Sequence, residues 1–184
     1  MLLPLAGAAI ISALPKNNEK AAKQAALGTT LVVMAVTIAM AVGFQRDNVE
    51  LQFVEKYAWI PSFGINFALG VDAIALVLIL MSVILAPIVV LAGWDEAHGG
   101  RWSVKTFYIL ILVLETMMIG VFAATDLFLF YVIFEAMLIP VYFLIGGYGT
   151  GERAAAAVKF LLYSLFGGLL MLASCLLYTS DAAD

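Results

Sequence analysis

Charged side chains are scarce in this chain. They make up 12% of its 184 residues, whereas hydrophobic residues make up 65%. A soluble domain carries about 25% charged residues, because its surface must stay in contact with water. The composition therefore excludes a soluble globular enzyme and a disordered chain. The net charge of −4 leaves no excess of basic side chains for phosphate groups, which excludes a nucleic-acid binder.

Cysteine and histidine are equally rare, with one residue of each. A single cysteine excludes a disulfide framework and any cysteine-rich zinc or iron–sulfur site. The only histidine, His98, lies in a polar loop, where we expect it to be solvated. We therefore expect no metal and no cofactor to bind this chain itself. An integral membrane protein is the class that remains.

Long apolar runs are abundant, and a helix crosses a bilayer with about 20 such residues. The first run is short, because Pro15 ends it. None alternates between polar and apolar residues, as the strands of a transmembrane barrel would. The sequence therefore predicts an all-α integral membrane protein with six transmembrane helices. They are expected at Leu2–Leu14, Ala25–Phe44, Val71–Gly93, Thr106–Ala124, Leu127–Gly147 and Ala154–Tyr178.

Lysine and arginine gather in alternate loops between these helices. Seven of the nine lie in or beside the first, third and fifth loops, and the other two, Arg46 and Lys56, lie in the second. Loops rich in lysine and arginine stay on the cytoplasmic side of a membrane. We therefore expect the odd-numbered loops in the cytoplasm and the N-terminus outside.

The second loop is the longest and has strand-like segments. Leu51–Ile60 and Ile65–Leu69 alternate in part between polar and apolar residues, and Pro61 to Gly64 lie between them. This pattern is typical of two strands joined by a turn. We predict a small extracytoplasmic β-hairpin between the second and third helices.

Two glutamates, Glu115 and Glu135, lie deep within apolar helices. An ionised group at the centre of a bilayer costs about 2.5–3.5 kcal/mol, so such residues commonly mark an ion or proton path. Each is ten residues from Thr125, in the tight turn between their helices. Both should therefore lie about 15 Å below that turn, at a depth where two carboxyl groups on antiparallel helices can face each other.

Prolines add polar backbone groups at the same depth. Pro140 has no N–H, so the carbonyl of Ala136, beside Glu135, loses its partner in the helix. Pro87 does the same to the carbonyl of Val83 in the third helix. A kink at either proline would open room for water, which membrane helices tolerate where they line a cavity.

Each candidate also has a structural interpretation. Glu115 and Glu135 could be packing groups that bond to hydroxyls on neighbouring helices. Lys159 lies near the end of the sixth helix, where it could extend to the lipid headgroups. Asp72 and Asp126 stand directly before helices, and we expect both to be N-caps.

The glutamate motif resembles a known family. Residues 126–147 read DLFLFYVIFEAMLIPVYFLIGG, which is similar to the core motif of subunit M among the antiporter-like subunits of bacterial NADH:quinone oxidoreductase (complex I). Residues 155–167, AAAVKFLLYSLFG, are similar to the next helix of that family, and WIPSFG and LGVD resemble its hairpin and third-helix start. Ala73 departs from the family's usual glycine.

The resemblance implies a proton-translocating membrane subunit. It places the family's essential fifth-helix glutamate at Glu135, its fourth-helix glutamate at Glu115 and its sixth-helix lysine, a possible relay, at Lys159. The family fold has about fourteen helices, so the chain is expected to be an N-terminal fragment. We divide it into a truncated membrane domain at 1–178 and a polar tail at 179–184 that does not resemble the family.

The resemblance also implies where the redox chemistry takes place. NADH, FMN, iron–sulfur clusters and quinone would bind to partner subunits, because this chain has no redox motif. Its own partners would be other membrane-arm subunits, the lipid bilayer, protons and water, with no nucleic acid. The expected location is the bacterial inner membrane. Two alternatives stay open: a subunit of a multisubunit cation/proton antiporter or membrane-bound hydrogenase, and a membrane scaffold that transports nothing.

Overall fold

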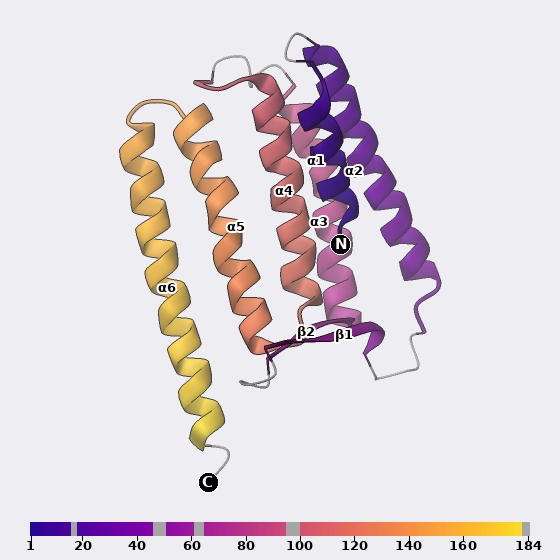
Figure 1. Ribbon diagram of the computed structural model, residues 1–184, viewed down its shortest axis with the longest axis vertical. Helices are drawn as coiled ribbons and strands as arrows, with labels where there is room; N and C mark the ends of the chain where they lie inside the picture. Colours follow the sequence, from indigo (N-terminus) through magenta and orange to yellow (C-terminus); the bar gives the residue numbers. More distant parts are fainter. Residues whose placement is uncertain (16–17, 46–50, 61–64, 95–99, 182–184) are drawn as a thin grey trace.

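A computed structural model of the chain describes residues 1–15, 18–45, 51–60, 65–94 and 100–181. These residues form six helices and one two-stranded sheet (Figure 1). In chain order the elements are α1 (Leu3–Ala13), α2 (Glu19–Val42), β1 (Gln52–Ile60), β2 (Ile65–Val71), α3 (Ala73–Ala92), α4 (Val104–Ala123), α5 (Leu127–Tyr148) and α6 (Arg153–Asp181). The predicted order of six helices with a hairpin between the second and third is confirmed.

Five of the six helices, α2 to α6, are long and apolar enough to cross a membrane. Helix α1 has 11 residues and rises only about 16 Å, roughly half of a bilayer's hydrocarbon core. Helix α2 begins at Glu19, six residues before the predicted span, because the Asn18 side chain accepts a hydrogen bond of 3.4 Å from the N–H of Ala21. The helix therefore extends beyond its apolar run.

Helix α4 lies at the centre of the bundle. It packs against α1, α2, α3 and α5, and its span is the most buried of the five. Helix α6 lies at the edge, where it packs against α5, and its span is the least buried (Figure 1). The outer surface of α6 carries large apolar side chains, as a face in contact with lipid or another helix would.

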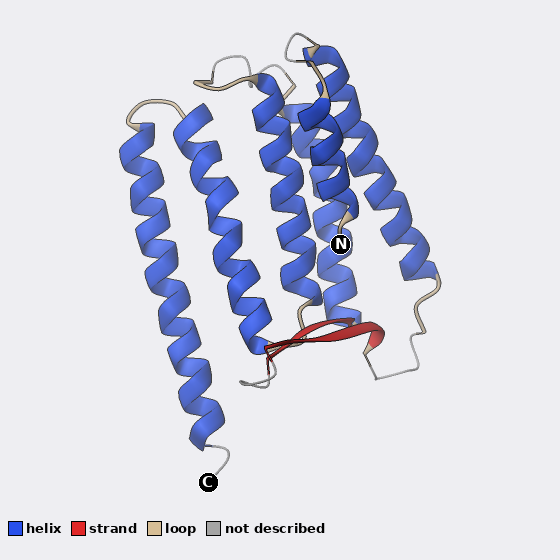
Figure 2. Cartoon of the chain, viewed as in Figure 1, coloured by secondary structure: helices blue, strands red, loops and turns tan. Residues whose placement is uncertain are grey.

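The hairpin lies across the ends of α3, α4 and α5 (Figure 2). Its strands pair antiparallel, with Lys56 opposite Ala68 and Tyr57 opposite Phe67. Residues 61 to 64, for which a turn was predicted, lie outside the described residues. The N–H of Thr125, between α4 and α5, donates a hydrogen bond of 3.0 Å to the carbonyl of Ala68. Strand β2 is thus attached to the α4–α5 turn.

Two lysines bind the carboxyl-terminal ends of helices at the opposite side of the bundle. The ammonium group of Lys105 donates to the carbonyls of Ser12 and Leu14, at 2.7 and 2.6 Å, where α1 ends. The ammonium group of buried Lys23 donates to the carbonyl of Trp94, just after α3, and lies 5.3 Å from the centre of the Trp94 ring. A positive charge at the carboxyl end of a helix is stabilising, because the last carbonyls are unpaired and partly negative.

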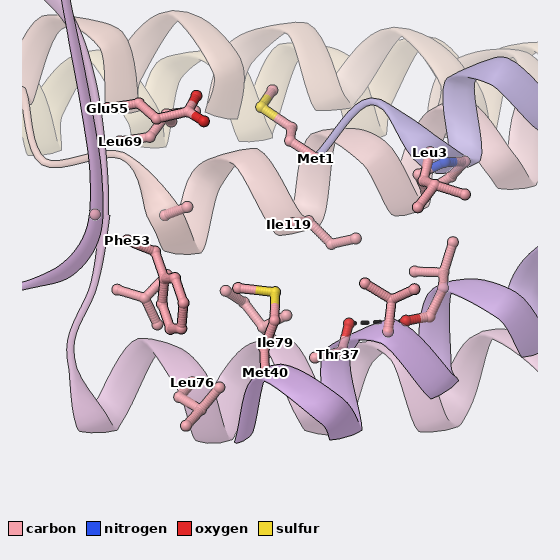
Figure 3. Close-up of a pocket in the computed structure, with 16 residues that line it drawn as sticks. Met1, Leu3, Thr37, Met40, Phe53, Glu55, Leu69, Leu76, Ile79 and Ile119 are labelled. Carbon is pink, nitrogen blue, oxygen red and sulfur yellow. Dashed lines mark hydrogen bonds between the residues drawn. The ribbon is translucent and has the colours of Figure 1, made fainter. Parts of the chain in front are cut away.

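A cavity of about 330 Å³ lies between the hairpin and helices α1 to α4 (Figure 3). Apolar side chains line most of it, including Met40, Phe53 and Ile79. Its polar side chains are Glu55 and Thr37, and the hydroxyl of Thr37 donates to the carbonyl of Val33 at 2.9 Å. None of the predicted site residues lines this cavity.

Candidate functional site

The α4–α5 turn sets the depth of both glutamates. Helix α4 ends at Ala123 and α5 begins at Leu127, so Thr125 lies midway between them, as predicted. Asp126 caps α5, since its carboxylate accepts hydrogen bonds from the N–H groups of Phe128 and Leu129 at 2.9 and 3.1 Å. The equal ten-residue spacing therefore places the two glutamates about 15 Å from the turn on antiparallel neighbours.

Glu115 is buried on the side of α4 that faces α3. Its side chain is 3% exposed, and neither carboxylate oxygen has a hydrogen-bond partner among the described residues. The residue lines a cavity of about 350 Å³, together with Ser82 and Ala86 of α3 and Leu144 of α5. An unpaired carboxylate in such a place is costly, so Glu115 stays a candidate functional residue.

Pro87 lies inside α3, next to Ala86 of this cavity, and is itself buried. Because proline lacks an N–H, the carbonyl of Val83 has no partner within the helix. The hydroxyl of Ser82 donates to the carbonyl of Leu78 at 2.9 Å. The Ser82 hydroxyl oxygen can still accept a hydrogen bond from another donor. Helix α3 thus brings polar atoms to the same region as Glu115.

Glu135 is covered from the other side, by α6. Both of its carboxylate oxygens are buried and have no hydrogen-bond partner in the described part of the chain. One oxygen lies against Gly168 of α6, in the space that a side chain would fill there. The hydroxyl of Tyr131, one turn earlier on α5, lies close enough to the carboxylate for an electrostatic interaction and a weak hydrogen bond, although the geometry is not that of a full hydrogen bond. Pro140, one turn and a residue later, lies inside the same helix.

The two carboxylates share a depth but have different neighbours. Glu115 lines the cavity at α3, and Glu135 lies against α6. Within the described ranges no hydrogen bond joins them. The bundle therefore holds two separate acidic positions at one level of the membrane, with α4 and α5 between α3 and α6.

Lys159 lies apart from both glutamates. It is exposed on α6 and lines an outer groove with Leu162, Tyr163 and Phe166. Gly168, which touches Glu135, is nine residues further along the same helix. Nine residues correspond to about two and a half helical turns, so Lys159 is on the opposite face of α6 from Glu135.

Other expectations have mixed outcomes. Asp72 caps α3 as predicted, with its carboxylate accepting from the N–H of Ala75 at 2.7 Å. His98 lies outside the described residues. In the part of the chain that the structure describes, no three acidic, histidine or cysteine side chains gather where they could hold a metal ion.

Two residues of interest were missed from the sequence. Gly168 is one of a glycine pair in an apolar helix, and only the packing of α6 on α5 distinguishes it from Gly167. Lys23 was counted as a loop charge, although the alanine-rich run around it and the Asn18 cap could have placed it inside a helix.

Comparisons with known proteins show what this chain is similar to. Residues 124–182, which include Glu135, Lys159 and Gly168, match the transmembrane family of NADH:quinone oxidoreductases and Mrp antiporters. NADH-quinone oxidoreductase subunit M of Mycobacterium tuberculosis (strain H37Rv) is 44% identical over 94% of this chain. Subunit M of Rhodobacter capsulatus is 41% identical over 92% of it. The NADH-ubiquinone oxidoreductase chain 4 of Arabidopsis thaliana is 36% identical over 96%.

The five apolar helices and the family match define a multi-pass membrane protein with an antiporter-like membrane domain. Within that class, the chain is a relative of subunit M of NADH-quinone oxidoreductase, which confirms the resemblance seen in the glutamate motif. It spans about a third of the length of these relatives, from 33% to 36%.

Proposed function

We propose that this chain is the N-terminal part of a proton-translocating subunit in the membrane arm of a respiratory NADH:quinone oxidoreductase. Glu135 would carry the proton, Glu115 would be a second carrier, and Lys159 would act as a relay. The observation that carries the proposal is the pair of buried carboxylates without hydrogen-bond partners in the described residues, at one depth of the membrane.

The surroundings of the carboxylates support this role. A packing glutamate would bond to a hydroxyl or an amide, because an unpaired polar group in an apolar environment is costly. Glu115 has no such bond among the described residues, and Glu135 has the Tyr131 hydroxyl within range but not in the geometry of a full hydrogen bond. The freed carbonyls at Pro87 and Pro140 instead offer acceptors for water, through which protons move. The cavity at Glu115 is lined mostly by apolar side chains, so water there would depend on the carboxylate and the Ser82 hydroxyl.

The chain would act as one part of a larger assembly. Its partners would be the other membrane-arm subunits and the surrounding lipid. NADH, FMN, iron–sulfur clusters and quinone would belong to partner subunits, which would supply the redox energy. The bacterial inner membrane would hold the complex, with the hairpin outside and the helix ends bound by Lys23 and Lys105 in the cytoplasm. Because α1 rises only about 16 Å from its cytoplasmic end, its first residues would lie within the membrane and not outside, where the loop charges predict them.

The test replaces Glu135 with glutamine in the complete subunit of the assembled complex. Glutamine keeps the size of the side chain but cannot release a proton. Proton uptake by inverted vesicles, divided by NADH oxidised, should fall sharply while the complex still assembles. The matched control is Glu152→Gln, which alters an exposed carboxylate in the α5–α6 loop.

The outcomes separate the possible roles. A normal ratio of protons to NADH in assembled Glu135→Gln complex would contradict the proposal and leave only a packing role. Loss of cation/proton exchange without any link to NADH oxidation would favour an antiporter subunit. Normal function of every glutamate variant would favour a scaffold.

A further inference from the structure

Helix α6 meets Glu135 at a residue without a side chain. A methyl group built on Gly168 would collide with Oε1 of Glu135, and it would lie 3.4 Å from the carboxyl carbon and 3.5 Å from a ring carbon of Phe134. The carboxylate thus occupies the space that any other residue at 168 would need. This contact covers the glutamate on the side of the bundle edge.

The neighbouring glycine has no such contact. A methyl group on Gly167 would meet nothing within 4 Å. Successive residues of a helix point about 100° apart, so Gly167 faces away from α5. A glycine inside a helix is destabilising relative to alanine. At Gly168 the close approach of Glu135 gives a physical reason for that cost, and at Gly167 no contact does.

We propose that Gly168 is a positioning residue for Glu135. The missing side chain lets the carboxylate lie against the backbone of α6, where both oxygens are buried without a hydrogen-bond partner in the described residues. The glycine thereby fixes the rotamer of Glu135 and closes its route to the lipid beyond α6. The inference deepens the proposed function, because it names what holds the proton carrier in place.

The experiment compares Gly168→Ala with Gly167→Ala in the assembled complex. Both variants make the same chemical change and both raise helix propensity, so a general effect on α6 would appear in both. The first readout is the rate at which dicyclohexylcarbodiimide, a lipid-soluble carboxyl reagent, modifies Glu135, followed by mass spectrometry. The second is the ratio of protons pumped to NADH oxidised across a range of pH.

Gly168→Ala should expose the carboxylate. We expect Glu135 to be modified about tenfold faster. Forcing one side chain away from its preferred rotamer changes the free energy enough to produce a tenfold change in rate. Proton pumping should fall and its pH profile should shift, because displacing a reacting group by about 1 Å can lower a rate by up to 100-fold. Gly167→Ala should behave as the unaltered complex does in both measurements.

A shorter carboxylate provides the rescue. Adding Glu135→Asp to Gly168→Ala withdraws the carboxylate by one methylene and should slow the modification again. If Gly168→Ala prevents assembly, the same second substitution should restore it. Assembly that stays lost in the double variant would overturn the proposal.

The two proposals fail in different ways. Equal modification rates in Gly168→Ala and Gly167→Ala would overturn the positioning role, whatever happens to pumping. Faster modification of Glu135 with unchanged pumping would support the positioning role and contradict proton transfer through Glu135.

Discussion

The backbone N–H of Asn66 donates a hydrogen bond of 3.4 Å to the carboxylate of Asp126, sixty residues later in the chain. The other oxygen of that carboxylate caps α5 through the N–H groups of Phe128 and Leu129. One side chain therefore begins the helix that carries Glu135 and also holds the hairpin against it.

Asp126→Ala should destabilise the protein by about 1 kcal/mol, the usual cost of a lost N-cap, or somewhat more because the hairpin contact is lost as well. The measurement is the denaturation midpoint of the purified chain in detergent micelles. Asp126→Asn is the matched control, since an asparagine oxygen can still accept the cap bonds. An alanine variant as stable as the asparagine variant would contradict this role.

Lys23→Met should destabilise the protein by about 1.5–3 kcal/mol, the range for a hydrogen bond that involves a charged group. The substitution removes the bond to the carbonyl of Trp94 and the contact with its ring. Lys20→Met removes an exposed lysine one turn earlier and should change the denaturation midpoint little. Equal effects of the two substitutions would mean that only net charge matters.

The three candidate carriers should differ in their effect on pumping. In the assembled complex, Glu135→Gln should reduce the ratio of protons to NADH most, Glu115→Gln less and Lys159→Met least. Glu135 has the freed carbonyl of Ala136 beside it and the closest contact with α6, whereas Lys159 is exposed on the far face of that helix. A larger fall in the ratio of protons to NADH for Lys159→Met than for Glu135→Gln would contradict this prediction.

The orientation can be tested by labelling single cysteines. In a chain with Cys175 replaced by serine, a maleimide that cannot cross the membrane should react from outside with Tyr57→Cys and not with Lys20→Cys. Tyr57 is exposed on β1 and Lys20 is exposed at the start of α2, at opposite ends of the bundle. The reverse pattern would place the hairpin in the cytoplasm and overturn this orientation.

Local signals predicted much of this fold. The apolar runs gave the helices, partial alternation gave the hairpin, and an aspartate before a helix gave the caps at Asp72 and Asp126. The start of α2 was missed because counting apolar residues ignores the Asn18 cap. Hydropathy locates the membrane-embedded part of a helix and says little about where the helix itself begins.

The sequence predicted the depth of the two glutamates in the membrane but not their neighbours. Ten-residue spacing placed Glu115 and Glu135 at one level, but their neighbours depend on how each helix is rotated. Helix α3 covers Glu115 and α6 covers Glu135, and neither contact follows from the spacing. The same holds for Gly168, which differs from Gly167 only through the position of α5.

The bond from Lys105 to the end of α1 has a consequence for the order of synthesis. The carbonyls of Ser12 and Leu14 receive their cation from a residue made about ninety positions later. Helix α1 also packs on α4, and it is too short to span the bilayer. During translation the first helix must therefore wait at the membrane without its final neighbour. It can pack on α4 only after two further spans and the hairpin have left the ribosome, so a chain interrupted before Lys105 would leave α1 packed on α2 and without the cation at its end.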